Sequence, residues 1–513
     1  MQRYEHSEKG KNSFQTYICL FSVFLCLMKN LLIIFLFIFQ AIGAQTPCSN
    51  GFAGEYPCND YDLMSRIPVE TLANTNGNPE GSDVWGWTDT TTGKEYAIAA
   101  MTNSTAFVDI TDPINPVFLG RLDSNAGNNY WRDVKVYNNH AFIVADNVGA
   151  HGMQVFDLTK LRGITSEQTF TSDAIYTTDD LGSCHNIFIN EDTGIAYLVG
   201  CKGPFNASLH SGGPIFVDIS DPKNPTKINH YSSAGYSHDA QVVNYIGPDT
   251  AYTNKEIYVG SNETKISILD VTDKNNVISI AEVNYAQLGY THQGWFTEDH
   301  RYFIVGDELD ERDLGLNTRT LIFDFSDLDN PVLSSNYYGS SSAIDHNGYV
   351  KDNHYFMASY RAGLRVLDLT NISSPTNSMT EVGSFDTYPE NNNTAFNGAW
   401  SVYPYFDSGN IIINDIERGL FVVRKSGTLH LNTSKKSPNF SVFPNPAINT
   451  TTINASNNLH IQNIKLFSIL GQKVFERKNL NELKYVLKTS SLKTGIYLIK
   501  INDQFTQKIV IQK

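Results

Sequence analysis

Short apolar runs recur along most of the chain, and polar turns separate them. Six segments share the form apolar-x-apolar-Asp-apolar followed by Ser, Thr or Lys, as in AFVDITDPINP and IFVDISDPKNP. Their aspartates are Asp109, Asp157, Asp218, Asp270, Asp324 and Asp368, and residues 419–427 (GLFVVRKSG) form a degenerate seventh copy. Two further apolar runs precede each copy. Runs of this length, bounded by Gly, Asn, Asp and Pro, predict strands rather than helices.

The first run of each repeat begins 50 to 54 residues after the previous one. The seven equivalent positions, called anchors below, are Ser82, Arg132, His185, His238, His292, His346 and Trp400. Strand-rich repeats of about 50 residues predict four-stranded units, and seven of them predict an all-β, seven-bladed β-propeller over 45–427. The seventh copy lacks an outer strand. We expect residues 63–72 (LMSRIPVETL) to supply it and so close the ring.

The N-terminal 44 residues predict an export leader. Residues 17–27 and 31–39 are strongly apolar, but Lys29 and Asn30 separate them. Met28 is the expected true start, and Ala41 to Ala44 resemble a cleavage site before Gln45. A retained membrane anchor is the alternative.

Four cysteines follow the leader: Cys48, Cys58, Cys184 and Cys201. They allow three pairings. Pairing Cys48 with Cys58 and Cys184 with Cys201 closes the two shortest loops and suits an oxidising compartment.

Charge divides the chain into unlike parts. The whole carries 38 Lys and Arg against 53 Asp and Glu, a formal charge of −15. Residues 440–513 are basic (+7), whereas 45–439 are strongly acidic (−24). This balance argues against nucleic-acid binding and predicts two domains with different tasks.

After a polar linker (428–439), residues 440–513 alternate as in a small antiparallel β-sandwich. They resemble the type A C-terminal sorting domain of type IX secretion at FPNP, LGQ and GIYLIK. The residues that carry the resemblance are Pro444, Asn445, Pro446, Gly471, Gly495, Tyr497, Leu498 and Lys500. It implies passage through the periplasm, handling by the type IX machinery, and a secreted or cell-surface product.

The repeats resemble the LVIVD repeat. Residues 45–427, with CSNGFAGEYPC, SDVWGW and TAFVDITDPINP, are similar to the secreted "choice-of-anchor B" family. This resemblance implies the fold and no particular chemistry.

Histidines occupy four consecutive anchors: His185, His238, His292 and His346. In a closed propeller these positions, with Arg132, surround one mouth of the central channel. Converging imidazoles suit a divalent transition metal, and Asp239 and Asp345 are candidate acceptors for the second ring nitrogens. Two alternatives remain open: each histidine bonds a neighbouring backbone carbonyl, or the ring binds a polar ligand without metal.

Acidic residues are expected in the loops on the same face: Asp146, Asp307, Glu308, Asp310 and Asp415. The run 307–313 could bind Ca²⁺ but lacks EF-hand spacing, so a solvated acidic loop is the preferred interpretation. The repeat aspartates are expected to accept turn amides rather than bind metal.

The leading functional hypothesis is a monomeric, non-catalytic binding protein with an unknown extracellular ligand, glycan or protein. The alternative is a metal-dependent extracellular hydrolase or lyase that uses the histidine ring. The chain lacks GxSxG, HExxH and P-loop patterns.

Overall fold

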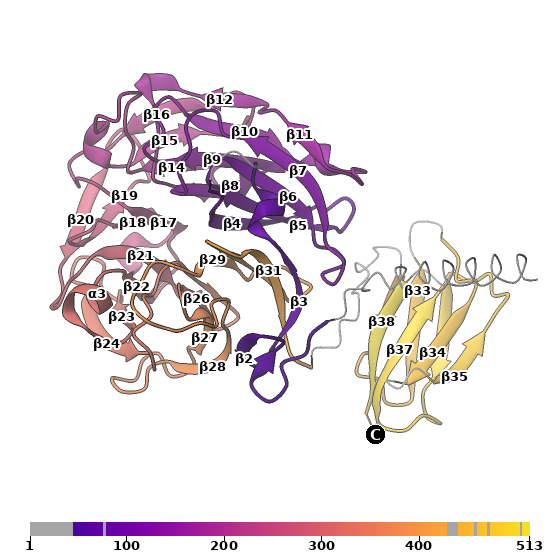
Figure 1. The fold of residues 1–513 in the computed structure, drawn as a ribbon. Coiled ribbons are helices and arrows are strands. Elements are labelled where there is room, and N and C mark those ends of the chain that lie inside the picture. The colour runs from indigo at the N-terminus through magenta and orange to yellow at the C-terminus, as the bar shows by residue number, and fades with distance from the viewer. Residues whose placement is uncertain are drawn as a thin grey trace, which may run out of the picture. The chain divides into compact units, whose positions relative to one another are not determined.

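The computed structural model describes residues 45–74, 78–427, 440–455, 459–468, 472–502 and 505–512. The predicted leader (1–44) and linker (428–439) lie outside these residues. Within them the chain folds into seven sheets arranged around a common centre, followed by two further sheets (Figure 1). The predicted seven-bladed propeller is confirmed.

Each blade is an antiparallel sheet whose first-named strand is innermost. Blade 1 contains β4 (Gly81–Thr88), β5 (Glu95–Met101), β6 (Ser104–Asp109) and β7 (Val117–Asp123). Blade 2 contains β8 (Arg132–Tyr137), β9 (His140–Ala145), β10 (Met153–Asp157) and β12 (Ala174–Tyr176). Blade 3 contains β13 (Asn186–Asn190), β14 (Ile195–Val199), β15 (Ile215–Asp218) and β16 (Thr226–His230). Blade 4 contains β17 (Asp239–Asn244), β18 (Glu256–Ser261), β19 (Ile266–Asp270) and β20 (Ile278–Val283).

The last three blades follow the same order. Blade 5 contains β21 (Thr291–Phe296), β22 (Tyr302–Asp307), β23 (Arg319–Asp324) and β24 (Val332–Tyr338). Blade 6 contains β25 (Gly348–Lys351), β26 (His354–Ser359), β27 (Gly363–Asp368) and β28 (Thr380–Phe385). Blade 7 contains β29 (Ala399–Tyr403), β30 (Asn410–Asp415), β31 (Gly419–Lys425) and, from the N-terminal segment, β3 (Tyr61–Ile67).

Pairing of β3 with β31 closes the ring, as the missing outer strand of blade 7 predicts. The register runs from Tyr61 opposite Lys425 to Ile67 opposite Leu420. β3 ends at Ile67, before Leu72, where the predicted strand (63–72) ends. Pro68 has no amide hydrogen to donate to a ladder, and the next residues form the helical turn α2 (Val69–Leu72).

Short extra elements cover outer edges of the sheets. The hairpin of β1 (Phe52–Ala53) and β2 (Tyr56–Asn59) extends blade 6 beyond β28. Strand β11 (Gln168–Phe170) pairs in parallel with β7 of blade 1. Gly120 permits this approach, because a Cβ there would lie 1.9 Å from the carbonyl oxygen of Gln168. Four single-turn 3₁₀ helices complete the loops: η2 (Leu158–Leu161), η3 (Thr178–Asp180), η4 (His210–Gly212) and η5 (Thr250–Tyr252).

The hydrophobic core lies between neighbouring blades. One cluster joins Val84 and Ala99 of blade 1 to Ile412 and Leu420 of blade 7, and Met64 of β3 packs into it. The closing strand is therefore held by side-chain burial as well as by its hydrogen bonds. No helix in the described part of the chain is long and apolar enough to cross a membrane.

The repeat aspartates have the structural role that the sequence predicts. Each accepts a hydrogen bond, at 2.8 to 3.0 Å, from the amide two residues further on; the donors are Thr111, Thr159, Ser220, Thr272, Ser326 and Thr370. This Asx geometry fixes the turn that follows the third strand of a blade.

The C-terminal part forms two antiparallel sheets that share a hydrophobic core of their own. One contains β32 (Phe440–Phe443), β33 (Thr450–Ala455) and β36 (Lys484–Lys488). The other contains β34 (Ile464–Ser468), β35 (Lys473–Arg477), β37 (Gly495–Ile501) and β38 (Phe505–Ile511). Val442, Ile453, Leu466 and Ile499 belong to the shared core.

Both predicted disulfides form: Cys48–Cys58 and Cys184–Cys201. The second bond joins residues 17 positions apart.

Replacing Cys184 and Cys201 with serine should lower the free energy of unfolding by about 3 kcal/mol, mainly because the unfolded chain gains freedom. Denaturant unfolding measures the change, and the Cys48→Ser, Cys58→Ser pair is the matched comparison. Four reactive thiols in the exported wild-type chain would contradict both bonds.

Candidate functional site

Irregular starts of inner strands position some of the anchors. In blade 5, Thr291 pairs with Asp307 and Gln293 with Gly306, so His292 is the extra residue of a bulge. Trp400 has the same place between Ala399 and Ser401 in blade 7. A bulge turns the inserted side chain away from ordinary strand alternation. Here it adds a side chain to the end of the channel.

The four histidines form a continuous arc, as predicted. Ring centroids lie 4.1 Å apart for His185 and His238, 4.3 Å for His238 and His292, and 4.3 Å for His292 and His346. Trp400 follows His346 at 4.8 Å.

A cavity of about 300 Å³ opens over this arc and is called the mouth pocket. Besides the four histidines, its lining includes aromatic and acidic side chains: Tyr130, Trp131, Tyr360, Phe396, Trp400, Glu80, Glu308 and Glu417. Tyr130, Trp131, Tyr360 and Phe396 are site residues that the sequence did not predict. Tyr130 and Trp131 directly precede an anchor, which is the one signal that points to them.

Main-chain carbonyls of the following blade orient two of the imidazoles. His238 Nδ1 donates to the carbonyl oxygen of His292 at 3.2 Å, and His346 Nδ1 donates to that of Trp400 at 2.5 Å. The predicted carbonyl bonds are thus present, and they leave the Nε2 lone pair of each ring available. Asp239 and Asp345 are not the acceptors: Asp239 bonds Asn186, and Asp345 bonds Thr320.

Burial keeps these rings neutral. It lowers the pKa of His238 and His292 well below the ordinary histidine value, and it lowers the pKa of His346 to about 4. A neutral imidazole is the form that can donate a lone pair to a metal or accept a hydrogen bond.

Glu308 brings a carboxylate to two of the histidines. Its Oε2 lies 3.8 Å from His292 Nε2, and its Oε1 lies 3.7 Å from His346 Nε2. The Tyr360 hydroxyl donates to Oε1 at 2.8 Å and orients the group. Burial raises the pKa of Glu308 to about 7. His292, Glu308 and His346 each offer one donor atom, and these atoms lie within 4.8 Å of one another, which is close enough to hold one metal ion.

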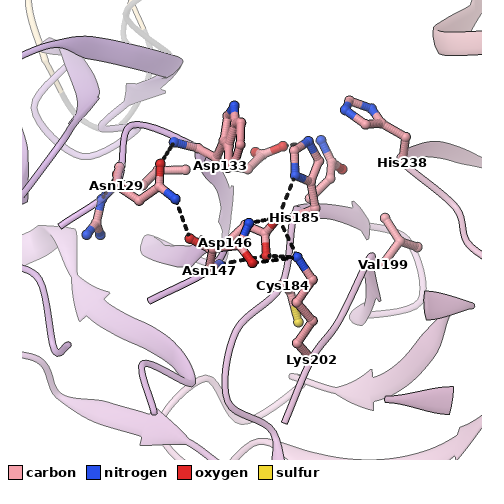
Figure 2. Close-up of polar contacts among 12 residues, drawn as sticks. Asn129, Asp133, Asp146, Asn147, Cys184, His185, Val199, Lys202 and His238 are labelled. Carbon is pink, nitrogen blue, oxygen red and sulfur yellow. Dashed lines mark hydrogen bonds and ion pairs between the residues drawn. The ribbon is translucent and has the colours of Figure 1, made fainter. Parts of the chain in front are cut away.

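His185 is oriented by a carboxylate instead (Figure 2). Its Nδ1 lies 3.1 Å from Asp146 Oδ2, while Lys202 Nζ donates to Asp146 Oδ1 at 2.9 Å and to Asn147. Although burial opposes ionisation, the bonds from His185 and Lys202 hold the pKa of Asp146 below its usual value. The adjacent Cys184–Cys201 bond joins the segments that carry His185 and Lys202.

Four of the five predicted acidic residues do not line the mouth pocket: Asp146, which bonds His185 and Lys202, and also Asp307, Asp310 and Asp415. Asp307 accepts from the amides of Gly289 and Tyr290, Asp310 from Arg319 Nε, and Asp415 from the amides of Glu417 and Arg418. All three are fully buried. Turn amides and a guanidinium bond these carboxyl groups inside the fold. Burial nevertheless raises the pKa of Asp310 and of Asp415 to about 7.

The acidic run 307–313 is not a solvated loop. Residues of this run form the helix α3 (Asp310–Leu314), in which Asp310 and Glu311 are buried. Arg319 pairs with Asp310, and its amide donates to Glu311. Of the run, only Glu308 lines the mouth pocket.

Arg132 also differs from the expectation. Its guanidinium is buried and donates to the carbonyl oxygens of Thr102 and Asn129 and to Ser124 Oγ. A further guanidinium nitrogen lies 3.3 Å from His151 Nε2. Arg132 therefore holds turns of the first two blades together and lies outside the lining of the mouth pocket.

A layer of polar residues closes the floor of the mouth pocket. It contains five residues that each follow an anchor directly: Asp83, Asp133, Asn186, Asp239 and Asn347. Lys135 Nζ lies 3.1 Å from Asp83 and also bonds Asp133. Only about 20 Å³ remains between the histidines and this layer, which is about the space of one water molecule.

Residues 441–512 match the family described as "Secretion system C-terminal sorting domain". Their motif residues have structural roles in the two sheets. Asn445 donates to the carbonyl oxygen of Lys508 and accepts from the amide of Val510, Thr451 donates to the carbonyl oxygen of Pro444, and Tyr497 donates to that of Lys493. Gly495, Leu498 and Lys500 belong to β37, Pro446 lies in the loop after β32, and Gly471 lies outside the described residues.

This sorting domain establishes that the type IX secretion machinery handles the protein. It directs the chain through the periplasm to the cell surface or the exterior.

Solved structures with similar folds share little sequence with the chain. PorZ, described as an essential surface component of the type IX secretion system of Porphyromonas gingivalis, is 12% identical with a TM-score of 0.40. The alignment covers 82% of this chain and 58% of PorZ. The β-propeller domain of Cps50 (Swd1) from Myceliophteria thermophila is 10% identical with a TM-score of 0.41, and the alignment covers 66% of this chain and 96% of that domain.

A protein from Lactobacillus plantarum is 11% identical with a TM-score of 0.40, and the alignment covers 80% of this chain and 98% of that one. No curated protein matches the chain in sequence. Similarity at this level carries no argument about ligand or activity. The resemblance of residues 45–427 to the choice-of-anchor B family stays a prediction.

Removing residues 440–513 should leave a folded propeller in the periplasm, because the sorting domain is the part that the export machinery handles. Cell fractionation and immunoblotting measure where the truncated chain accumulates, with the full chain as control. Normal delivery of the truncated chain to the surface would contradict the assignment.

Acid should destabilise the fold through His151. Burial, together with the Arg132 guanidinium, lowers the pKa of His151 to about 4, so the folded state holds it neutral. The unfolded chain takes up a proton below about pH 6.5, so stability falls as the pH drops from there to about 4. This one group should remove about 3 kcal/mol across that window.

His151→Gln should reduce this pH dependence, as measured by denaturant unfolding at neutral and acidic pH. An unchanged difference between the two pH values in the variant would contradict this role for His151.

Proposed function

We propose that the chain is a binding protein of the cell exterior that takes its ligand in the mouth pocket. We further propose that a divalent transition metal, zinc foremost, is held there by His292, Glu308 and His346. The observation that carries both proposals is the pair of distances, 3.8 and 3.7 Å, from the Glu308 oxygens to the two Nε2 atoms.

These distances agree with a metal site of ordinary size. Bonds of about 2.0–2.1 Å in a tetrahedral site place neighbouring donor atoms about 3.3 Å apart. Each of the two imidazole nitrogens needs to approach its nearest Glu308 oxygen by only about half an ångström to reach that spacing. Two imidazoles and one carboxylate also form a donor set that zinc uses in proteins.

The surroundings of the pocket favour a positively charged or metal-bound ligand. Its lining combines three glutamates with four histidines and includes neither lysine nor arginine. Rigid aromatic walls such as Trp400 and Phe396 supply contact area at small entropic cost. A ligand that binds the metal could therefore also pack against the pocket wall.

The second candidate is a metal-dependent hydrolase or lyase that acts on an extracellular polymer. It is favoured by the number of donors, because three protein ligands leave a coordination position for water or substrate. The cavity of about 300 Å³ above them gives a substrate segment access.

Metal analysis tests the proposal directly. After incubation with zinc and removal of the excess, the purified exported chain should retain about one equivalent, and acid should release it as the ligands protonate. Glu308→Gln and His292→Ala should each lose most of this zinc while retaining the wild-type circular dichroism spectrum. His354→Ala, which changes a histidine outside the mouth pocket, is the matched control.

Less than about a tenth of an equivalent of zinc or manganese in the wild-type chain would exclude the metal proposal. Release of new chain ends from polysaccharide or protein, present with zinc and absent in His292→Ala, would support the enzyme. Zinc retention without such release would support the binding protein.

A further inference from the structure

A second and larger cavity lies at the opposite end of the same inner strands. It measures about 450 Å³ and is called the far pocket. Six of its residues stand three positions after an anchor, one in each of six blades: Trp85, Lys135, Phe188, Gln241, Trp295 and Tyr403. Because successive strand residues alternate between two faces, these positions share the channel side with the polar layer two residues earlier. The far pocket, like the histidine arc, is therefore built from equivalent positions of successive blades.

Aromatic rings form rigid walls in the far pocket. Trp85 packs edge-to-face on Tyr403, with centroids 5.1 Å apart. On another blade, Trp295 packs in the same way on Tyr349 at 4.9 Å and on Phe188 at 5.9 Å. The two indoles remain only partly buried. Rings held by their neighbours present flat contact surfaces with little loss of side-chain entropy on binding.

Charges of the far pocket are largely compensated within the protein. Lys135 at its inner end is paired with Asp83 and Asp133, and its Nζ lies 4.6 Å from the Trp85 ring centroid. At the outer end, Glu298 accepts from the amide of Asp352. Lys135 repels a cation in the far pocket, and Glu191 and Glu298 repel an anion. This arrangement favours a neutral ligand over either ion.

We propose that the far pocket binds the end of a neutral carbohydrate chain. Sugars combine apolar C–H faces, which pack on flat aromatic rings, with hydroxyl groups that need hydrogen-bonding partners. The far pocket supplies both, with Trp85 and Trp295 as walls and with the side-chain amide of Gln241 and the carboxylate of Glu298 in its lining. Its volume lies within the range of small-molecule sites. This site is separate from the mouth pocket and needs no metal.

Titration of the exported chain with neutral hexasaccharides of glucose, mannose, galactose and N-acetylglucosamine tests the proposal. Binding is measured by calorimetry and by tryptophan fluorescence. At least one sugar should bind with a Kd below about 1 mM, and chelation of metal with EDTA should leave that Kd unchanged.

Two substitutions of one residue separate stacking from folding. Trp295→Ala should weaken sugar binding by about tenfold or more, and Trp295→Phe, which keeps an aromatic ring against Tyr349, should weaken it less. Tyr338→Ala removes an exposed ring from the outer strand of the same blade and should leave the Kd unchanged. Thermal unfolding of each variant verifies the fold.

Three results would overturn the proposal. The first is that none of the four sugars binds at up to about 10 mM. The second is that binding persists unchanged in both Trp295 variants. The third is that tetramethylammonium, a probe for cation–π recognition, binds at the far pocket in place of sugar.

Discussion

Pairing of β3 with β31 is the constraint on which the rest of the structure depends. Both pockets are built from residues of different blades, so neither exists until the ring closes. The cluster that joins Met64 to Val84 and Ile412 links the first blade, the last blade and the closing strand in one core. Closure also lets the first and last blades bury their facing sides against each other. The N-terminal segment thus completes blade 7, which is the blade that precedes the sorting domain in sequence.

Inside the closed ring, strand alternation arranges the chemistry in layers. The histidine arc lies at one end of the channel, where His292 is the extra residue of a bulge and the other three histidines precede their inner strands. The polar layer with Lys135 comes next, and the aromatic walls of the far pocket follow. Burial of Asp83 and Asp133 is tolerable because Lys135 pairs with both. This layer separates two pockets of different character, one suited to a metal and one to a neutral ligand.

The repeat made the blades, the closing strand, both disulfides and the histidine arc predictable, because each depends on periodicity or on short sequence spacing. Whether an individual charged side chain is buried or exposed, and what it bonds, was not predictable in the same way. Asp307 and Asp415 are the last residues of β22 and β30, and their local sequence does not distinguish them from exposed acidic residues. Only the tertiary structure shows that amides of neighbouring turns bond them. Arg132 occupies an anchor, but its long side chain reaches carbonyls of a neighbouring turn instead of the channel. The aromatic residues of the mouth pocket, such as Trp131, could not be predicted, since no sequence pattern distinguishes a pocket wall from a packed ring.

The central claim is that one metal ion joins two blades through His292, His346 and Glu308. A crystal of the exported chain soaked in zinc, measured at the zinc absorption edge, tests it most directly. The account predicts one strong anomalous peak within about 2.2 Å of both Nε2 atoms and of a Glu308 oxygen. The absence of a peak in the mouth pocket, or a peak coordinated by other residues, would contradict it.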